Sequence, residues 1–317
     1  MDITWRTAPA WLALLLGGGV FIDAQQPLGQ RTPNADGVQV LPVQGNVYLL
    51  AGAGQANAAV QVGKDGALLV DTMTASMADA LTAALRSLTA KPVRIIVDTS
   101  FHPERTGGNE LMQARGATGL TQVPGGLATI IAHENVLNRL TAPVASQRTP
   151  PAQKGLPTSE FSTPQKDFYF NGEPIVVYHE PRAHSDGDSI VFFRRSDVIA
   201  AGDVFTPDRY PLIDLESGGS VNGLIDALNH ILVLTVPEKL QDGGTRVIPG
   251  HGRISNEADV VEYRDMVLIV RDRVRDAIAK GQSRAQVRDA RLVLDYENRY
   301  GPADAFVDAV YTSLGGR

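Results

Sequence analysis

Residues 93–109 read VRIIVDTSFHPERTGGN, and this stretch decides how the rest of the chain is interpreted. Four of its first five residues, VRIIV, are apolar and β-branched, which predicts a buried strand. The strand runs into a polar loop that contains His102 and the glycine pair Gly107 and Gly108. In open α/β sheets, loops at the carboxyl ends of strands converge on the ligand site. The stretch therefore predicts an α/β fold with a functional loop around His102.

Three further polar side chains lie beside apolar runs elsewhere in the chain. His184 lies in the loop PRAHSDGDS before the run IVFF, Asp203 ends the run DVIAAGD, and His251 follows a strand in VIPGHG. Packing of an apolar core does not require polar side chains at the ends of several strands. We therefore interpret these three residues, together with His102, as one site. The other histidines lack such loops and are not proposed as ligands: His133, His179 and His230.

The pattern of apolar residues predicts an α/β protein whose sheet is covered on both faces. Strands are expected at residues 38–50, 58–62, 67–70, 93–97, 189–193, 198–201 and 245–248, with the first two forming a hairpin. Helices are expected at residues 76–88, 223–235 and 260–279. The segment 141–166, rich in Pro, Ser, Thr and Gln, is interpreted as a surface loop or lid within one domain.

Composition excludes several classes of protein and of site. The chain has 317 residues, of which 43% are hydrophobic, so it can bury a substantial core. Its formal net charge of −6 argues against a nucleic-acid partner, which needs a concentrated basic face. The sequence contains no cysteine, which rules out disulfides, thiolate ligands and a cysteine nucleophile. Any metal ion must therefore be held by histidines and carboxylates.

The first residues predict export. Residues 10–22 read AWLALLLGGGVFI, an apolar run too short to span a membrane, and Arg6 precedes it. We interpret residues 1–24 as a signal peptide cleaved after Ala24, with an uncleaved N-terminal anchor as the alternative. Residues 25–317 would then form a single periplasmic or secreted domain that has no stable membrane span.

Five motifs, taken in order, resemble those of the metallo-β-lactamase superfamily. They are LLVDT, VDTSFHPERTGGN, AHSDGDSIVFF, AGDVF and VIPGHG, and the resemblance covers roughly residues 38–255. It implies an α/β fold in the form of a four-layer αβ/βα sandwich, with a metal site at one edge of the two sheets. The part of the chain from AHENVLNRL to the final helix resembles an exported bacterial branch of that superfamily.

The resemblance also implies a set of metal ligands. The family's second motif is His-x-His-x-Asp-His, and the corresponding residues here are Ser100, His102, Glu104 and Arg105. His102 and His184 would then belong to a first metal site in which Ser100 replaces the third imidazole.

Glu104, Asp203 and His251 would form a second site in the same family pattern. Zinc is the expected ion, with one per chain as the leading interpretation and two as the alternative. Arg105, in place of the motif's last histidine, would either pair with Asp203 or Glu104 or hold an anionic substrate. Asp71, at the end of LLVDT, resembles the family's buried aspartate that supports the histidine loop.

The function implied is hydrolysis of a carboxylic ester, amide or lactam bond in a small molecule by a metal-activated water. His102 or His184 could act as a general base, and Glu104 could orient the water. The alternative is a degenerate, metal-poor protein of the same fold with a binding or scaffold role and no turnover, because Ser100 and Arg105 replace two usual ligands.

Overall fold

The computed structural model describes residues 37–117, 126–142 and 154–316. The predicted signal peptide and the middle of the 141–166 segment lie outside these ranges. Within them, no helix combines the length and apolar character needed to cross a membrane.

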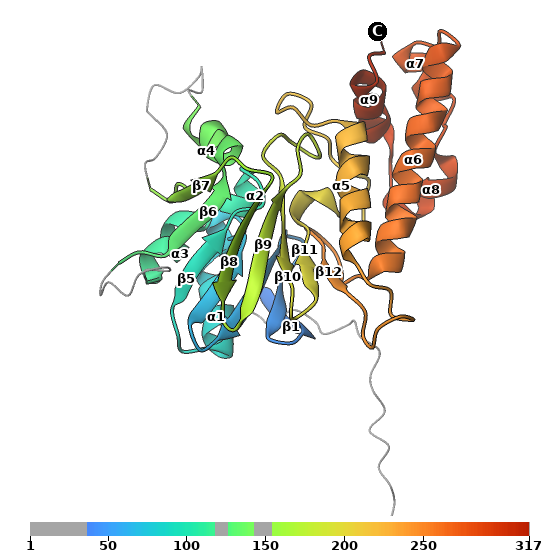
Figure 1. The fold of residues 1–317 in the computed structure, drawn as a ribbon. Helices are drawn as coiled ribbons and strands as arrows, with labels where there is room; N and C mark the ends of the chain where they lie inside the picture. The colour runs from blue at the N-terminus through green and yellow to red at the C-terminus, as the bar shows by residue number, and fades with distance from the viewer. Residues whose placement is uncertain (1–36, 118–125, 143–153, 317) are drawn as a thin grey trace, which may run out of the picture. The chain divides into compact units, whose positions relative to one another are not determined.

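The first sheet has seven strands that follow one another in sequence order (Figure 1). They are β1 (Val38–Gln44), β2 (Val47–Gly52), β3 (Asn57–Gly63), β4 (Gly66–Val70), β5 (Val93–Val97), β6 (Thr129–His133) and β7 (Ser159–Phe161). The strands from β1 to β4 pair antiparallel, whereas β4 to β7 pair parallel. The carboxyl ends of β4 and β5 consequently share one edge, which places Asp71 beside the loop that carries His102.

The second sheet has five strands in the order β12-β11-β10-β9-β8. They are β8 (Gln165–Phe170), β9 (Glu173–His179), β10 (Ser189–Phe193), β11 (Val198–Ala200) and β12 (Arg246–Ile248). β9 and β11 are both antiparallel to β10, and β12 is parallel to β11. The loops that leave β9, β11 and β12 therefore emerge at one edge, and they carry His184, Asp203 and His251 in turn.

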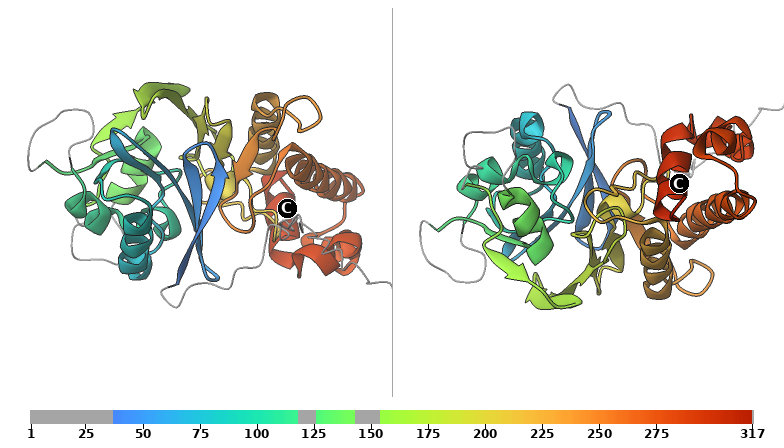
Figure 2. Two further views of the ribbon diagram at one scale, coloured as in Figure 1. Left: turned by 90° about the horizontal axis from the view of Figure 1, so that it is seen from below. Right: turned by 90° about the horizontal axis from the view of Figure 1, so that it is seen from above.

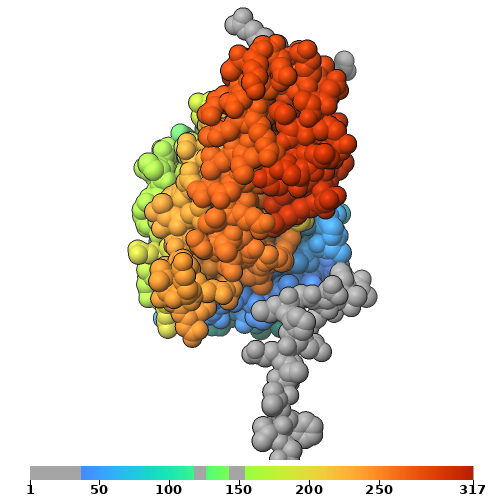
Figure 3. Space-filling model, turned by 90° about the vertical axis from the view of Figure 1, so that its right-hand side faces the viewer, coloured from blue at the N-terminus to red at the C-terminus, as the bar shows by residue number. Residues whose placement is uncertain are grey.

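Helices cover the outer face of each sheet. The helices of the described residues are α1 (Ala78–Leu88), α2 (Pro103–Thr106), α3 (Asn109–Arg115), α4 (Glu134–Thr141), α5 (Val221–Leu234), α6 (Glu257–Ala279), α7 (Arg284–Asp289), α8 (Leu294–Tyr300) and α9 (Asp304–Ser313), with 3-10 turns η1 (Ala75–Met77) and η2 (Gly202–Val204). In the views along the sheets, α1 and α3 lie on one side and α5 and α6 on the other (Figure 2). The C-terminal helices α6 to α9 pack together as one block (Figure 3).

Three apolar clusters separate these layers. One joins α1 and α3 to the first sheet, one lies between the two sheets, and the third packs α5, α6 and α9 against the second sheet. Helix, sheet, sheet and helix thus make four layers. The predicted αβ/βα sandwich is confirmed.

Local chemistry explains where the observed elements depart from the predicted ones. The expected strand at 38–50 is in fact two strands, because the chain turns tightly at Gly45, whose φ of 59° suits glycine. α5 begins earlier than expected because Ser220 accepts a hydrogen bond from the backbone N–H of Gly223. α6 likewise begins early because Asn256 and Asp259 form a reciprocal capping box.

Candidate metal centre

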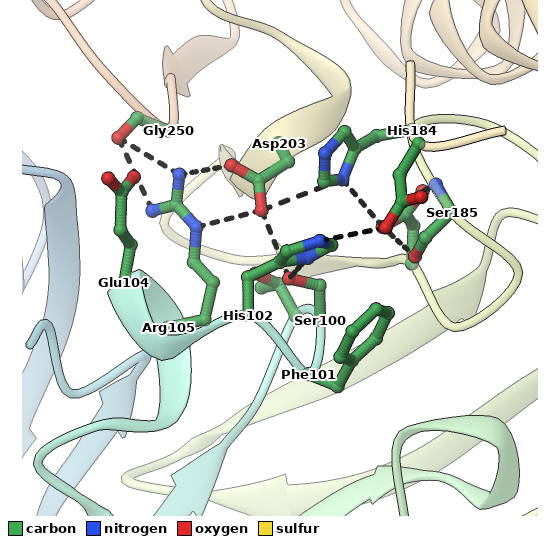
Figure 4. A network of polar contacts seen from close by, with 12 residues as sticks. Ser100, Phe101, His102, Glu104, Arg105, His184, Ser185, Asp203 and Gly250 are labelled. Atoms are coloured by element: carbon green, nitrogen blue, oxygen red, sulfur yellow. Dashed lines mark hydrogen bonds and ion pairs between the residues drawn. The ribbon is translucent and has the colours of Figure 1, made fainter. Parts of the chain in front are cut away.

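Three of the predicted ligands meet where the two sheets present their loops. His102 lies at the start of α2, His184 in the loop after β9, and Asp203 in η2 after β11. Among the described residues, these three make the one group of His, Cys, Asp or Glu side chains that could hold an ion, and their donor atoms lie within 4.8 Å of one another (Figure 4). Two imidazoles and a carboxylate are ligands that zinc accepts.

His184 is buried with an unused polar atom. Its Nδ1 has no hydrogen-bond partner within the described residues, since the Asp188 and Asp203 carboxylates are 3.6 and 3.8 Å away. Its ring lies against that of His102, with ring centroids 4.5 Å apart. Burial opposes the charged imidazolium, but the carboxylates of Asp188 and Asp203 outweigh burial and raise the pKa of His184.

Arg105 is completely buried and is bound to Asp203 through two hydrogen bonds. Its Nε and Nη2 donate to the two Asp203 carboxylate oxygens at 3.1 and 2.5 Å, and Nη1 donates to the carbonyls of Asn57 and Gly250. Burial alone would raise the pKa of Asp203, but Arg105 and His184 hold it well below its usual range. Asp203 is therefore a permanent anion whose charge is already paired with a cation.

Ser100 lies inside the same group. Its hydroxyl donates to Oδ2 of Asp203 at 3.0 Å, and its Oγ is 3.3 Å from Nδ1 of His102. The side chain is fully buried. A hydroxyl is a weaker zinc ligand than the imidazole of the family pattern, so this position adds a hydrogen bond rather than a strong ligand.

Glu104 and His251 lie apart from the three-residue group. Oδ2 of Asp203 faces Ser100 and Arg105, whereas Nε2 of His251 contacts Oε2 of Glu104 at 3.0 Å. The side chain of Glu104 is half exposed, and in Figure 4 the guanidinium of Arg105 lies between Glu104 and Asp203. Burial and the charges of Arg105 and Arg209 lower the pKa of His251. The structure thus divides the five predicted ligands into a group of three and a separate pair.

Asp71 supports the loop that carries Ser100 and His102. Its carboxylate accepts hydrogen bonds from the backbone N–H and the hydroxyl of Thr99, and it lies 3.6 Å from Nη1 of Arg105. Burial raises the pKa of Asp71 to about 7, an effect that Arg105 and Thr99 only partly offset. These contacts connect the end of β4 to the histidine loop through side chains.

Sequence patterns did not single out Asp214, although it contacts both histidines of the group. Nε2 of His102 lies 3.2 Å from Oδ2 of Asp214, and the backbone N–H of Asp214 donates to the carbonyl of His184 at 2.8 Å. The residue lies in the stretch PLIDLESGGS, outside any strand or helix. The serine and glycine residues that follow it, which suit a tight loop, are the only signal in the sequence.

The other histidines lie outside this group. His133 caps α4, where its Nδ1 accepts from the backbone N–H of Asn135, and its ring stacks on His179 with centroids 3.6 Å apart. His230, on α5, contacts Glu180 at 2.6 Å. The stacking of His133 on His179 was not expected from the sequence.

Comparison with known proteins places the fold in a family. The sequence model of the metallo-beta-lactamase superfamily matches residues 51–251, which is more than half of the chain. No curated protein matches the sequence.

Solved structures with the same fold include two kinds of enzyme. A stereoselective inverting sec-alkylsulfatase from Pseudomonas sp. is 17% identical with a TM-score of 0.64, over 87% of this chain and 50% of the sulfatase chain. A metallo-beta-lactamase from Pontibacter korlensis is 17% identical with a TM-score of 0.55, over 73% of this chain and 99% of the lactamase. The chain thus spans half the length of the sulfatase, and at these identities the likeness concerns the fold.

The family match covers the strands and loops that carry the candidate site. It includes Asp71, the histidine loop after β5, His184, Asp203 and His251. The two sheets and their outer helices agree with the architecture of the matched structures. The chain belongs to the metallo-beta-lactamase superfamily.

Proposed function

We propose that this protein is a hydrolase that depends on one divalent metal ion, zinc being the expected ion, held by His102, His184 and Asp203. The observation that carries the proposal is the convergence of these three side chains, with donor atoms within 4.8 Å. When bound, zinc would lower the pKa of a bound water and polarise the carbonyl of the substrate.

The residues present fit one ion better than two. The buried Nδ1 of His184 lacks a hydrogen-bond partner among the described residues, as expected for an atom that binds a metal. At the second predicted site, the guanidinium of Arg105 lies between Glu104 and Asp203 (Figure 4), while Glu104 and His251 contact each other. A fixed cation at this position opposes a second divalent ion. The stoichiometry we propose is therefore one ion per chain.

The chain's own residues supply the remaining chemistry. Arg105 keeps Asp203 ionised, Ser100 donates a hydrogen bond to it, and Oδ2 of Asp214 lies 3.2 Å from Nε2 of His102. Glu104 is exposed enough to reach solvent at the edge of the site, where it could accept a proton from a water. We propose a small molecule with a carboxylic ester, amide or lactam bond as the substrate. Because a sec-alkylsulfatase shares the fold, a sec-alkyl sulfate belongs in the same assay panel.

A second candidate function is a metal-poor binding or scaffold role without turnover. The buried Arg105–Asp203 pair favours it, because Arg105 satisfies the charge of Asp203 without a metal ion. A zinc ion would have to share Asp203 with this guanidinium.

Metal content decides between the two candidates. Protein purified without chelator and then dialysed should carry about one zinc per chain, by the ligand count above. His184→Ala should lose the ion, whereas His230→Ala, a histidine outside the group, should retain it. Metal-free parent protein with no hydrolysis across the panel would favour the binding role.

A further inference from the structure

Asp214 has a hydrogen-bond partner for each of its polar atoms, and two of these atoms contact the two histidines. Oδ2 faces Nε2 of His102 at 3.2 Å, and Oδ1 accepts from the backbone N–H of Ser217 at 3.0 Å. Its backbone N–H donates to the carbonyl of His184, and its carbonyl accepts from Gly219, both at 2.8 Å. One loop residue thereby ties the loop after β5 to the loop after β9.

The Asp214 contact determines which nitrogen of His102 carries the proton. A neutral imidazole has one N–H donor and one acceptor nitrogen, and an ionised carboxylate can only accept. The side chain of Asp214 is partly exposed and accepts the backbone N–H of Ser217, and an aspartate is ordinarily ionised at neutral pH. Nε2 of His102 must therefore carry the hydrogen, which leaves the lone pair on Nδ1.

Nδ1 of His102 faces Ser100. It lies 3.3 Å from Oγ of Ser100, and the single hydroxyl proton of Ser100 has a closer acceptor in Oδ2 of Asp203, at 3.0 Å. Deprotonated Nδ1 is thus the nitrogen of His102 that lies beside Ser100, whose hydroxyl is bound to Asp203, and its lone pair is free to bind a metal. A histidine that binds metal through one nitrogen commonly donates its other N–H to a carboxylate, which sets its tautomer and orientation.

We propose that Asp214 is a positioning residue that selects the Nε2–H tautomer of His102 and so presents Nδ1 to an ion shared with His184 and Asp203. The part of this inference that concerns an ion rests on the proposed function, whereas the tautomer follows from Asp214 alone. Asp214 touches neither the ion nor the substrate in this role.

Asp214→Asn is the decisive variant because it keeps the shape of the side chain. Its amide oxygen can still accept from Ser217, which turns the NH₂ group toward Nε2 of His102. Two donors cannot face each other, so His102 should change to the Nδ1–H tautomer, and Nδ1 could no longer bind an ion. Asp208→Asn is the matched control, since Asp208 lies on the same connection before α5 and its carboxylate pairs with exposed Arg209.

Two measurements test the inference. Zinc affinity, measured by competition with a chromophoric chelator, should fall about 10- to 100-fold in Asp214→Asn and stay unchanged in Asp208→Asn. Two-bond ¹H–¹⁵N spectra of the metal-free protein at alkaline pH should show His102 as Nε2–H in the parent and Nδ1–H in Asp214→Asn. The His102→Gln variant should lack the imidazole cross-peaks of one histidine, and the missing cross-peaks are those of His102.

The possible outcomes separate this inference from the proposed function. A parent that binds no zinc, but whose His102 changes tautomer in Asp214→Asn, would refute the metal-dependent function and support the positioning role. A parent with Nδ1–H on His102, or an Asp214→Asn variant whose tautomer and zinc affinity match the parent, would overturn the inference.

Discussion

Arg105 is the buried cation of this site. Its guanidinium is fully buried, contacts Asp203 through two hydrogen bonds and lies 3.6 Å from Asp71. The Asp203 and Asp71 carboxylates are largely buried, so water cannot solvate their charge once the cation is removed. The residue that replaces a metal ligand in the family motif is therefore also a structural cation.

Removing this cation should destabilise the fold. Arg105→Ala leaves Asp203 and Asp71 without their common partner, and we expect the free energy of unfolding to fall by about 3–5 kcal/mol. Urea unfolding in the presence of a chelator measures this change without a contribution from bound metal. Arg209→Ala, which removes an exposed arginine, should stay within about 0.5 kcal/mol of the parent. A loss as small as that of the control would contradict a structural role for Arg105.

Restoring the family's imidazoles should increase metal uptake. Ser100→His adds a nitrogen ligand beside Asp203, and Arg105→His deletes a cation that opposes a divalent ion by about 1–4 kcal/mol at close range. The double variant, taken from the folded fraction, should bind close to twice the metal of the parent in elemental analysis. The single Ser100→His variant is the control and should stay at the parent's stoichiometry. A parent that already holds two ions would rule out the single-metal interpretation.

Among the elements, β6 and β9 meet through a stacked pair of histidines. His133 at the end of β6 and His179 at the end of β9 belong to different sheets, and their rings lie 4° from parallel. Burial and the neighbouring His179 lower the pKa of His133 to about 4, and burial also lowers the pKa of His179. The contact between the strand ends therefore requires neutral rings.

The histidine pair should make stability depend on pH. Between about pH 6.5 and 4 the unfolded chain binds a proton at His133 that the folded protein does not, so the free energy of unfolding falls as the pH falls. The lowered pKa of His133 corresponds to a change of up to roughly 3 kcal/mol in the free energy of unfolding. Urea unfolding as a function of pH measures this slope.

His133→Asn isolates the contribution of the ring. Asparagine can cap α4 as His133 does, but it does not titrate. The variant should lose part of the pH slope while its stability at neutral pH changes by about 1 kcal/mol or less. A slope equal to the parent's would assign the acid sensitivity to other groups.

At the scale of the whole molecule, the packing of the four layers and the edges of the two sheets explain where the site lies. Three apolar clusters hold the four layers together, and none of the polar residues of the site belongs to them. Loops at one edge of each sheet carry the site instead, since parallel pairing points strand ends in one direction. The apolar core thus fixes the positions of the sheets, and the loops supply the side chains of the site.

Export is a prediction for the whole chain. The apolar run at residues 10–22 after Arg6 predicts cleavage after Ala24, so mature protein from the native host should begin near Gln25. Mass spectrometry of the N-terminal peptide in periplasmic and secreted fractions measures this. Protein that begins at Met1 in the cytoplasmic fraction would exclude the periplasmic or secreted location.

The sequence by itself determined the fold class and the loops that carry the site. Apolar runs such as residues 93–97 indicate buried strands. A histidine or aspartate just beyond such a run indicates where the strand ends. These are local signals, so the α/β architecture, α1 and the loops of His102, His184 and Asp203 could be predicted without a structure.

Only the tertiary structure decided which of those side chains meet. It separates Glu104 and His251 from Asp203, surrounds Arg105 with two carboxylates, and brings Asp214 to His102 across 112 positions of sequence. Periodicity records which face of an element is buried, but distances of a few ångströms between loops of different sheets depend on how the sheets pack. A hydrogen bond or an ion pair is decided at that scale, because its strength falls steeply with distance and angle.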